Sequence, residues 1–134
     1  MEIAAEPCLD VAKQLVALCR EGKNAEAIQT LYADDIVSVE VMGDEEMPKE
    51  MHGLDAVLGK TRWWMDNHEV HAGETFGPFP HGDRFIVHFK YDVTPKIGPM
   101  AGQRITMQEA ALYTAKDGKI VREEFFYDMT APKS

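Results

Sequence analysis

The pair Asp117-Gly118 constrains the fold of this chain more than any other feature, because it joins two long strand patterns. The segments 103–115 and 119–128 are rich in β-branched and aromatic residues, and a two-residue Asp-Gly loop between such segments is typical of a type I′ hairpin. A tight turn of this kind sets the pairing register, so Lys116 is expected to lie opposite Lys119. The chain therefore contains a long antiparallel ribbon.

The predicted register sorts the side chains of this ribbon onto two faces. The first face carries Gln108, Ala110, Leu112, Glu123, Phe125 and Tyr127. The second face carries Met107, Glu109, Ala111, Tyr113, Arg122, Glu124, Phe126 and Asp128. Neither face is plainly polar, so both are expected to be covered at least in part. The first face is either core or the wall of a ligand cavity, and the second is an interface.

Length and charge limit the class of protein. The chain has 134 residues, 45% of them hydrophobic, which suits one domain spanning 1–134. Its formal net charge of −9 argues against nucleic-acid binding, since neutralising phosphates needs clustered Lys and Arg. No apolar run has membrane-spanning length, and the N-terminus does not resemble a signal peptide. We expect a cytoplasmic protein that binds neither nucleic acid nor membrane.

The order of helix and strand patterns predicts an α+β domain. The helices are expected at 8–21, 24–33 and 53–67, and the strands at 36–42, 68–78, 84–95, 103–115 and 119–128. The acidic segment 43–51 contains Pro48 and is interpreted as an exposed loop. Helices followed by a run of strands with short connections indicate an antiparallel sheet that curls around the helices.

Three short motifs, in this order, resemble the nuclear transport factor 2-like superfamily, and its SnoaL-like branch most closely. The motifs are Tyr32-Ala33-Asp34-Asp35, His52-Gly53-Leu54-Asp55-Ala56-Val57, and Asp117-Gly118-Lys119-Ile120-Val121 ending in Tyr127-Asp128. The resemblance covers essentially the whole chain and implies a cone-shaped α-α-β-α-β-β-β-β fold. In that fold a strongly bent antiparallel sheet wraps the helices and leaves an internal pocket. Members include isomerases, polyketide cyclases, epoxide hydrolases, dehydratases and non-catalytic binding modules, so fold alone does not decide function.

Glu40 and Glu123 are the candidate catalytic residues. Glu40 follows the Ala-Asp-Asp motif at the place where the resemblance puts the proton-shuttling carboxylate of steroid isomerases. The predicted register puts Glu123 on the first ribbon face. Two carboxylates that share a cavity can differ in protonation state, one acting as acid and the other as base. The alternatives are that Glu40 is exposed beside the acidic loop and that Glu123 forms an ion pair near the sheet edge.

The sequence departs from the catalytic patterns of three enzyme classes of this superfamily. Positions that resemble the oxyanion-hole donors of steroid isomerases fall near Val16 and Ala110, whose side chains cannot donate a hydrogen bond. The position of the cyclase acid aligns with Phe125, and no Asp-Arg-Asp trio of the epoxide hydrolase kind is apparent. The catalytic pattern of each of these three classes is therefore incomplete in this sequence.

Aromatic side chains form the expected wall of the pocket. The pocket or binding candidates are Trp63, Trp64, Phe89, Tyr91, Gln108, Phe125 and Tyr127. Trp63 and Trp64 point about 100° apart on one predicted helix, so only one of them can face the cavity. Phe89 and Tyr91 belong to an alternating series along 84–95 whose polar members face outward.

The five histidines do not predict a metal site. His68 and His71 straddle a helix-to-strand junction, where a three-residue spacing does not make two ligands converge, and no third ligand is fixed nearby. No metal or other cofactor is expected.

These observations favour a pocket protein for a small, largely apolar, carbonyl-containing compound, acting as a cofactor-free isomerase, dehydratase or cyclase. The alternative is a non-catalytic ligand-binding or dimerisation module of the same fold, which gains support if both candidate glutamates are solvated. A homodimer is expected through the convex sheet face, formed by the apolar residues of the second ribbon face, which are Met107, Ala111, Tyr113 and Phe126.

Overall fold

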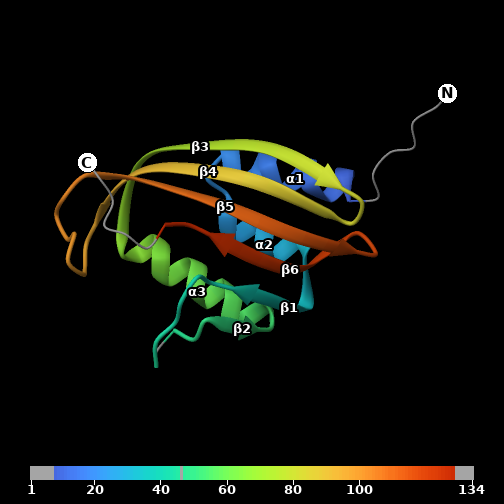
Figure 1. The fold of residues 1–134 in the computed structure, drawn as a ribbon, viewed down its shortest axis with the longest axis horizontal. Coiled ribbons are helices and arrows are strands. Elements are labelled where there is room, and N and C mark those ends of the chain that lie inside the picture. The colour runs from blue at the N-terminus through green and yellow to red at the C-terminus, as the bar shows by residue number, and fades with distance from the viewer. Residues whose placement is uncertain (1–7, 46, 129–134) are drawn as a thin grey trace.

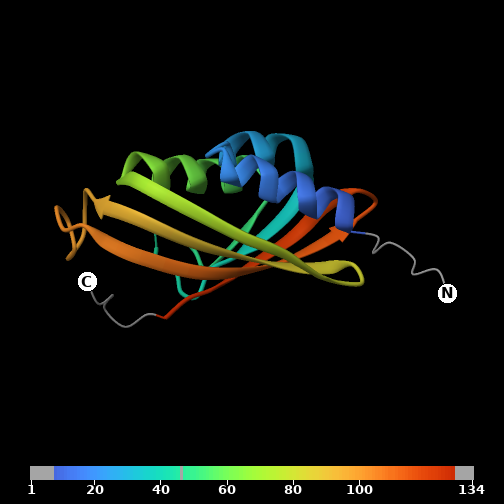
Figure 2. The ribbon, with the colours of Figure 1, turned by 90° about the horizontal axis from the view of Figure 1, so that it is seen from above.

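The computed structural model describes residues 8–45 and 47–128, in which three helices pack on one face of a bent six-stranded sheet (Figure 1). The helices are α1 (Leu9–Arg20), α2 (Asn24–Leu31) and α3 (Leu54–Asp66). The strands are β1 (Tyr32–Val39), β2 (Glu50–His52), β3 (His68–His81), β4 (Arg84–Pro95), β5 (Ile105–Lys116) and β6 (Lys119–Phe126). Figure 2 shows all three helices on the concave side of the sheet. The predicted α+β cone is confirmed.

The sheet is mixed, not wholly antiparallel as predicted. Its strand order is β2-β1-β6-β5-β4-β3, and β1 runs parallel to β6 while the other neighbours are antiparallel. The short strand β2 overlaps the end of the acidic segment 43–51, which was interpreted as a loop. A parallel pair joins segments that are far apart in sequence, so the residue pattern of either strand alone does not predict the pairing.

The core fills the space between the helices and the sheet. It contains Val11, Leu15 and Val16 of α1, Ala27 and Ile28 of α2, and Val57 of α3. The alternation predicted along β4 is confirmed, because Phe85, Val87, Phe89 and Val93 are buried and Tyr91 is partly buried against the core. Within the described ranges, no helix has the length and apolar character needed to cross a membrane.

The hairpin turn forms as predicted. Asp117 and Gly118 have φ values of 53° and 78°, and a type I′ turn needs positive φ at both positions. Lys116 pairs with Lys119. The register then shifts, because Ala115 pairs with Ile120 whereas the preceding Thr114 pairs with Arg122. One extra residue, Val121, therefore forms a β-bulge in β6.

The bulge reverses the faces of all β6 residues beyond it, relative to the predicted pairing. Glu123 lies opposite Tyr113 and not Leu112, and Phe125 lies opposite Ala111. Since Ala111 and Tyr113 are buried in the core, this side of the ribbon faces the helices. The predicted register beyond the turn was wrong, because the residue pattern of β6 does not reveal that one residue lacks a partner on β5.

Two further assignments change with the register. Gln108 is exposed on the outer face of β5, so it does not line the interior as predicted. Glu109 lies on the inner face instead of the outer one, since it alternates with Gln108 and shares a face with Ala111 and Tyr113.

Candidate functional site

A network of polar side chains lies inside the cone, between β1, β6 and α3. Its members are Tyr32 and Ser38 of β1, Glu40 just after β1, Lys60 of α3, Glu123 of β6 and Tyr127 just after β6. We call these six residues the Lys60 cluster. The parallel pairing of β1 with β6 creates it, because that register sets Ser38 opposite Glu123.

Glu123 is the buried end of the Lys60 cluster, with 2% of its surface exposed. The Tyr32 hydroxyl donates a hydrogen bond to one carboxylate oxygen, and the Ser38 hydroxyl donates to the other at 2.6 Å. The Lys60 ammonium lies 4.0 Å from this second oxygen. Burial raises the pKa of Glu123, while the Lys60 charge and the two hydrogen bonds oppose the rise. Both oxygens of Glu123 are thus occupied by protein donors.

Lys60 connects the buried end of the cluster to Glu40. Its Nζ atom donates to Ser38 Oγ at 2.5 Å and to Glu40 Oε1 at 2.8 Å. It also lies 4.9 Å from the centre of the Phe125 ring, a distance at which the aromatic face attracts a cation. Lys60 was missed in the sequence, although its spacing from the buried Val57 puts it on the inward face of α3.

Glu40 is the solvent-facing end of the cluster, with its side chain 25% exposed. Its Oε1 accepts from Lys60, and its Oε2 accepts from the Tyr127 hydroxyl at 3.0 Å. Burial, followed by the Glu40 charge, raises the pKa of Tyr127, so this hydroxyl stays protonated as a donor. Glu40 is therefore neither unpaired in an apolar cavity nor fully exposed beside the acidic loop.

Glu109 adds a third carboxyl to this interior. It lies opposite Phe89 of β4 and is partly buried. Among the described residues it has no ion pair or hydrogen bond from its side chain. Burial raises its pKa to about 7, the negative charges of Glu40 and Glu123 add to the rise, and Lys60 opposes it. Glu109 therefore exchanges a proton near neutral pH, which is the range that acid-base catalysis uses.

Aromatic rings line the interior next to Glu109. Trp64 stacks on His68 with ring centres 4.3 Å apart and lies 5.5 Å from Tyr91. Tyr91 in turn stacks on Phe89 at 6.0 Å. Trp63 is 44% exposed, so Trp64 is the tryptophan that faces inward. Together with Phe125 beneath Lys60, these rings give the interior an apolar wall.

The raised pKa of Glu109 predicts how stability changes with pH. The folded protein holds this proton more tightly than the unfolded chain does, so its contribution is fully present below pH 4.5 and is lost as pH rises to about 7. Relative to Glu109→Gln, the free energy of unfolding of the wild type should fall by roughly 2–3 kcal/mol over this interval. Urea unfolding of both proteins at pH 5 and pH 8 measures the change. Glu74→Gln, at an exposed position of β3, is the control, and an equal difference at both pH values would contradict the prediction.

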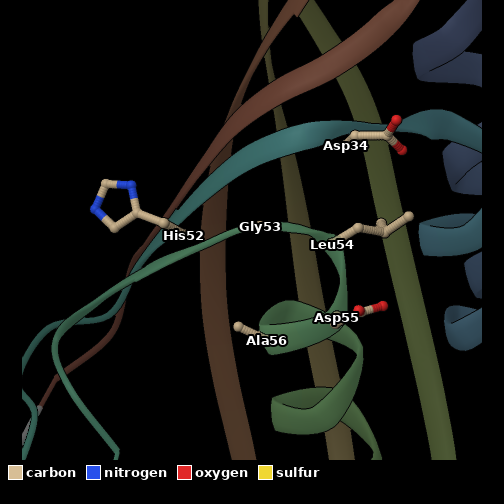
Figure 3. A pocket seen from close by; sticks show the side chains of 6 residues that line it. All are labelled: Asp34, His52, Gly53, Leu54, Asp55 and Ala56. Atoms are coloured by element: carbon tan, nitrogen blue, oxygen red, sulfur yellow. The ribbon is translucent and has the colours of Figure 1, made fainter.

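An open depression of about 420 Å³ lies elsewhere, at the junction of β1, β2 and the start of α3. Figure 3 shows that the side chains lining it do not converge, because His52 points away from Asp34 and Asp55. None of the Lys60 cluster residues lines this depression. We therefore place the candidate site in the cone.

Residues 8–45 and 47–128 contain no group of three His, Cys, Asp or Glu side chains arranged to hold a metal ion. His68 Nδ1 contacts the Trp64 carbonyl oxygen at 2.7 Å, and His71 Nε2 contacts Thr94 Oγ1 at 2.7 Å. The two histidines thus contact separate parts of the fold.

Comparison with known proteins identifies a protein family and solved structures that share this fold. A SnoaL-like domain model matches residues 8–127. A candidate SnoaL-like polyketide cyclase from Mesorhizobium loti is 44% identical, the match covers 89% of this chain and 97% of that one, and the TM-score is 0.81. No curated protein matches the chain.

Two more distant structures share the fold. A protein with a ketosteroid isomerase-like fold from Catenulispora acidiphila, in complex with trimethylamine, is 19% identical over 96% of this chain and 91% of that one, with a TM-score of 0.69. A protein with a cystatin-like fold from Xanthomonas campestris is 17% identical over 92% of each chain, with a TM-score of 0.70.

Proposed function

Since this chain belongs to the SnoaL-like family, we propose that it binds a small, largely apolar, carbonyl-containing compound and moves a proton on it without a cofactor. The reaction is of the isomerase, dehydratase or cyclase type. The observation that carries the proposal is that Lys60 bonds to Glu40 and that both groups act electrostatically on Glu109, which lies opposite Phe89 of the aromatic wall. Carboxyls and a cation held in an apolar interior are suited to proton transfer near neutral pH.

Proton transfer next to a carbonyl needs a base for the carbon-bound proton and a donor for the oxygen. When a carboxylate takes the proton, the electron pair of the C–H bond forms a C=C bond and negative charge develops on the oxygen. Lys60 and Tyr127 are the N–H and O–H donors at the solvent-facing end of the cluster. A hydrogen bond from either one stabilises the developing charge.

The two candidate glutamates of the sequence have different parts in this proposal. Glu40 is partly exposed, so a bound compound can reach it. Glu123 is buried and accepts hydrogen bonds at both oxygens, so it supports the site from within the core. Glu109, which has no competing hydrogen bond among the described residues, takes the place of Glu123 as the second proton-transfer group.

Hydrogen exchange on simple carbonyl compounds tests this function. A panel of small cyclic ketones, esters and β-dicarbonyl compounds is incubated with the protein in D₂O, and loss of the α-proton signal is followed by NMR. At least one compound should exchange faster than with the heat-denatured protein. Binding of several compounds without faster exchange of any would contradict catalysis.

A non-catalytic binding module is the second candidate, and the pairing of Lys60 with Glu40 favours it. Groups that satisfy each other in the unliganded protein are less available to a reacting molecule. The relative from Catenulispora acidiphila holds trimethylamine, and an interior with three carboxyls and one lysine also suits a small amine. Saturable binding of trimethylammonium together with no proton exchange on the carbonyl panel would favour this candidate.

We further propose a homodimer through the convex face of the sheet. The membership of the predicted patch changes, because Ala111 and Tyr113 belong to the core. Strand pairing instead aligns two outward rows across β3 to β6. These rows are Phe76, His88, Ala110 and Phe126, and Phe79, Ile86, Leu112 and Glu124. Phe76, Phe79, Ile86 and Phe126 are each at least 41% exposed, and so large an apolar surface favours association.

Phe126→Glu should weaken this dimer. A charge buried within an apolar interface costs more than about 1 kcal/mol, so the dissociation constant should rise about tenfold or more. Sedimentation equilibrium at micromolar concentrations measures it, with Ile97→Glu as the control because Ile97 is exposed in the 96–104 connection, away from both rows. A wild type that remains monomeric at tens of micromolar would contradict the proposal.

A further inference from the structure

A second hollow lies on the convex face of the sheet, apart from the interior of the cone. It has a volume of about 220 Å³ and is lined by Phe79 and His81 of β3, by Arg84, Phe85 and Ile86 of β4, and by Leu112 of β5. It lies at the end of the sheet where β3 turns into β4, on the right of Figure 1. None of the Lys60 cluster residues lines it, so a ligand bound there goes beyond the proposed reaction.

Strand pairing and one bulge build the apolar wall of this hollow. Phe79 lies opposite Ile86, and Ile86 lies opposite Leu112, so the three side chains form one outward row. The pairing of β3 with β4 shifts between Phe76 and Phe79, where β3 has one extra residue. A side chain at Gly77 would come within 3.4 Å of the Phe79 ring and 3.0 Å of the Ile86 carbonyl oxygen. The bulge and the glycine together therefore leave room for the Phe79 ring beside Ile86.

The rim of the hollow is basic. Arg84 lies directly opposite His81, so their side chains leave the same face of the sheet with about 5 Å between the Cβ atoms. Among the described residues, neither side chain has an ion pair or a hydrogen bond, and Asp83 of the adjoining turn bonds to neither. A guanidinium presents its N–H donors in a planar fork that matches the two oxygens of a carboxylate. A carboxylate is therefore the complement of this rim.

We propose that this hollow is a second ligand site, which binds a small carboxylate with an apolar tail. The tail lies along Phe79, Ile86 and Leu112, and the carboxylate accepts hydrogen bonds from Arg84 and His81. A water molecule takes about 30 Å³ of the liquid, so a hollow of about 220 Å³ holds roughly seven to nine non-hydrogen atoms. Hexanoate is of this size and serves as the probe.

The apolar row of the hollow also belongs to the face through which the homodimer is proposed. A ligand and a second copy of the chain would therefore compete for Phe79, Ile86 and Leu112. For this reason binding is measured both in the wild type and in Phe126→Glu, the variant that weakens the dimer. Phe126 does not line the hollow, so this substitution leaves the ligand site itself intact.

Titration with hexanoate, hexan-1-ol and hexylammonium separates the contribution of the charge from that of the tail, since all three have six carbons. Chemical shifts of backbone amides and methyl groups follow each titration at low ionic strength. Hexanoate should bind saturably and at least about fivefold more tightly than hexan-1-ol, because a carboxylate adds charge-assisted hydrogen bonds to Arg84. The shift changes should centre on Ile86 and Leu112. Equal affinity for hexanoate and hexylammonium would overturn the proposal.

Variants then assign the two halves of the site. Arg84→Gln should weaken hexanoate binding about fivefold or more and leave hexan-1-ol binding unchanged. Arg62→Gln is the matched control, because Arg62 is exposed on α3, on the other side of the sheet, and its loss changes the net charge equally. Ile86→Ser, at a position that is 43% exposed, should weaken the binding of both compounds, since it removes apolar contact.

Two results would overturn the proposal. One is an equal loss of hexanoate affinity in Arg84→Gln and Arg62→Gln, and the other is no saturable binding of hexanoate in either the wild type or Phe126→Glu. Saturable binding that appears only in Phe126→Glu supports the site and shows that a second copy covers it in the wild type. The carbonyl exchange assay reports on the cone alone, so the two ideas fail independently.

Discussion

Replacing Glu109 with glutamine should slow proton exchange on an active carbonyl compound by about 10²–10⁴-fold, the usual contribution of a general acid or base. Glutamine has nearly the same shape but cannot transfer a proton. Because Glu109 has no hydrogen-bond partner to lose among the described residues, the fold should be unaffected. Exchange rates from NMR at pH 6.5 give the comparison, with Glu74→Gln on β3 as the control.

The pH profile gives the same prediction a second measurement. Burial and the neighbouring carboxylates raise the pKa of Glu109 to about 7, so activity that needs its proton should decline above that pH in the wild type. In Glu109→Gln the residual activity should lose this decline. A variant that retains the full rate and the same profile would show that another group supplies the proton.

Glu123→Ala should be the most destabilising change in the site, lowering the free energy of unfolding by about 3–5 kcal/mol. The substitution leaves the Tyr32 and Ser38 hydroxyls without their acceptor and Lys60 without its buried counter-charge. It also opens a cavity under β1. Glu123→Gln keeps the volume and one acceptor oxygen, so its effect should be smaller. Equilibrium urea unfolding near pH 7 measures both.

Glu124→Ala is a natural control because Glu124 is the next residue along β6. Its carboxylate accepts from Arg122 at 2.6 Å on the partly exposed outer face. Ion pairs of this kind contribute about 0–1 kcal/mol. Similar losses for Glu123→Ala and Glu124→Ala would mean that the buried network adds little stability.

Local patterns predicted most of the fold. The Asp117-Gly118 turn, the helices and the inward face of β4 follow from residue spacing, because a turn type and an amphipathic face depend on neighbours in the chain. The predicted alternation of buried and outward side chains from Phe85 to Val93 is confirmed, since β4 is a central strand with only one buried side.

The candidate site was only partly predictable, because it depends on contacts between distant segments. Lys60 meets Glu123 only through the parallel pairing of β1 and β6, and a lysine on a helix usually faces solvent. Glu109 was assigned to the wrong face, since the choice of inner face for β5 depends on what packs against it. Glu40 was found through family resemblance, and its partners came only with the tertiary structure.

The bulge at Val121 has a consequence for comparing this chain with its relatives. The bulge decides the face on which Glu123 lies, because regular pairing of the same residues from the turn would place Glu123 opposite Leu112 on the outer face and Glu124 opposite Ala111 on the inner one. Loss of Val121 would remove the extra residue and restore regular pairing, in which Arg122 still lies opposite Thr114 and Glu123 still lies opposite Tyr113. A sequence alignment that opens a one-residue gap at Val121 therefore keeps the inner and outer faces of β6 in place. A relative that is one residue shorter in this stretch can thus present a carboxylate at the position of Glu123 on the same inner face, and a search for the site in other sequences should allow that gap.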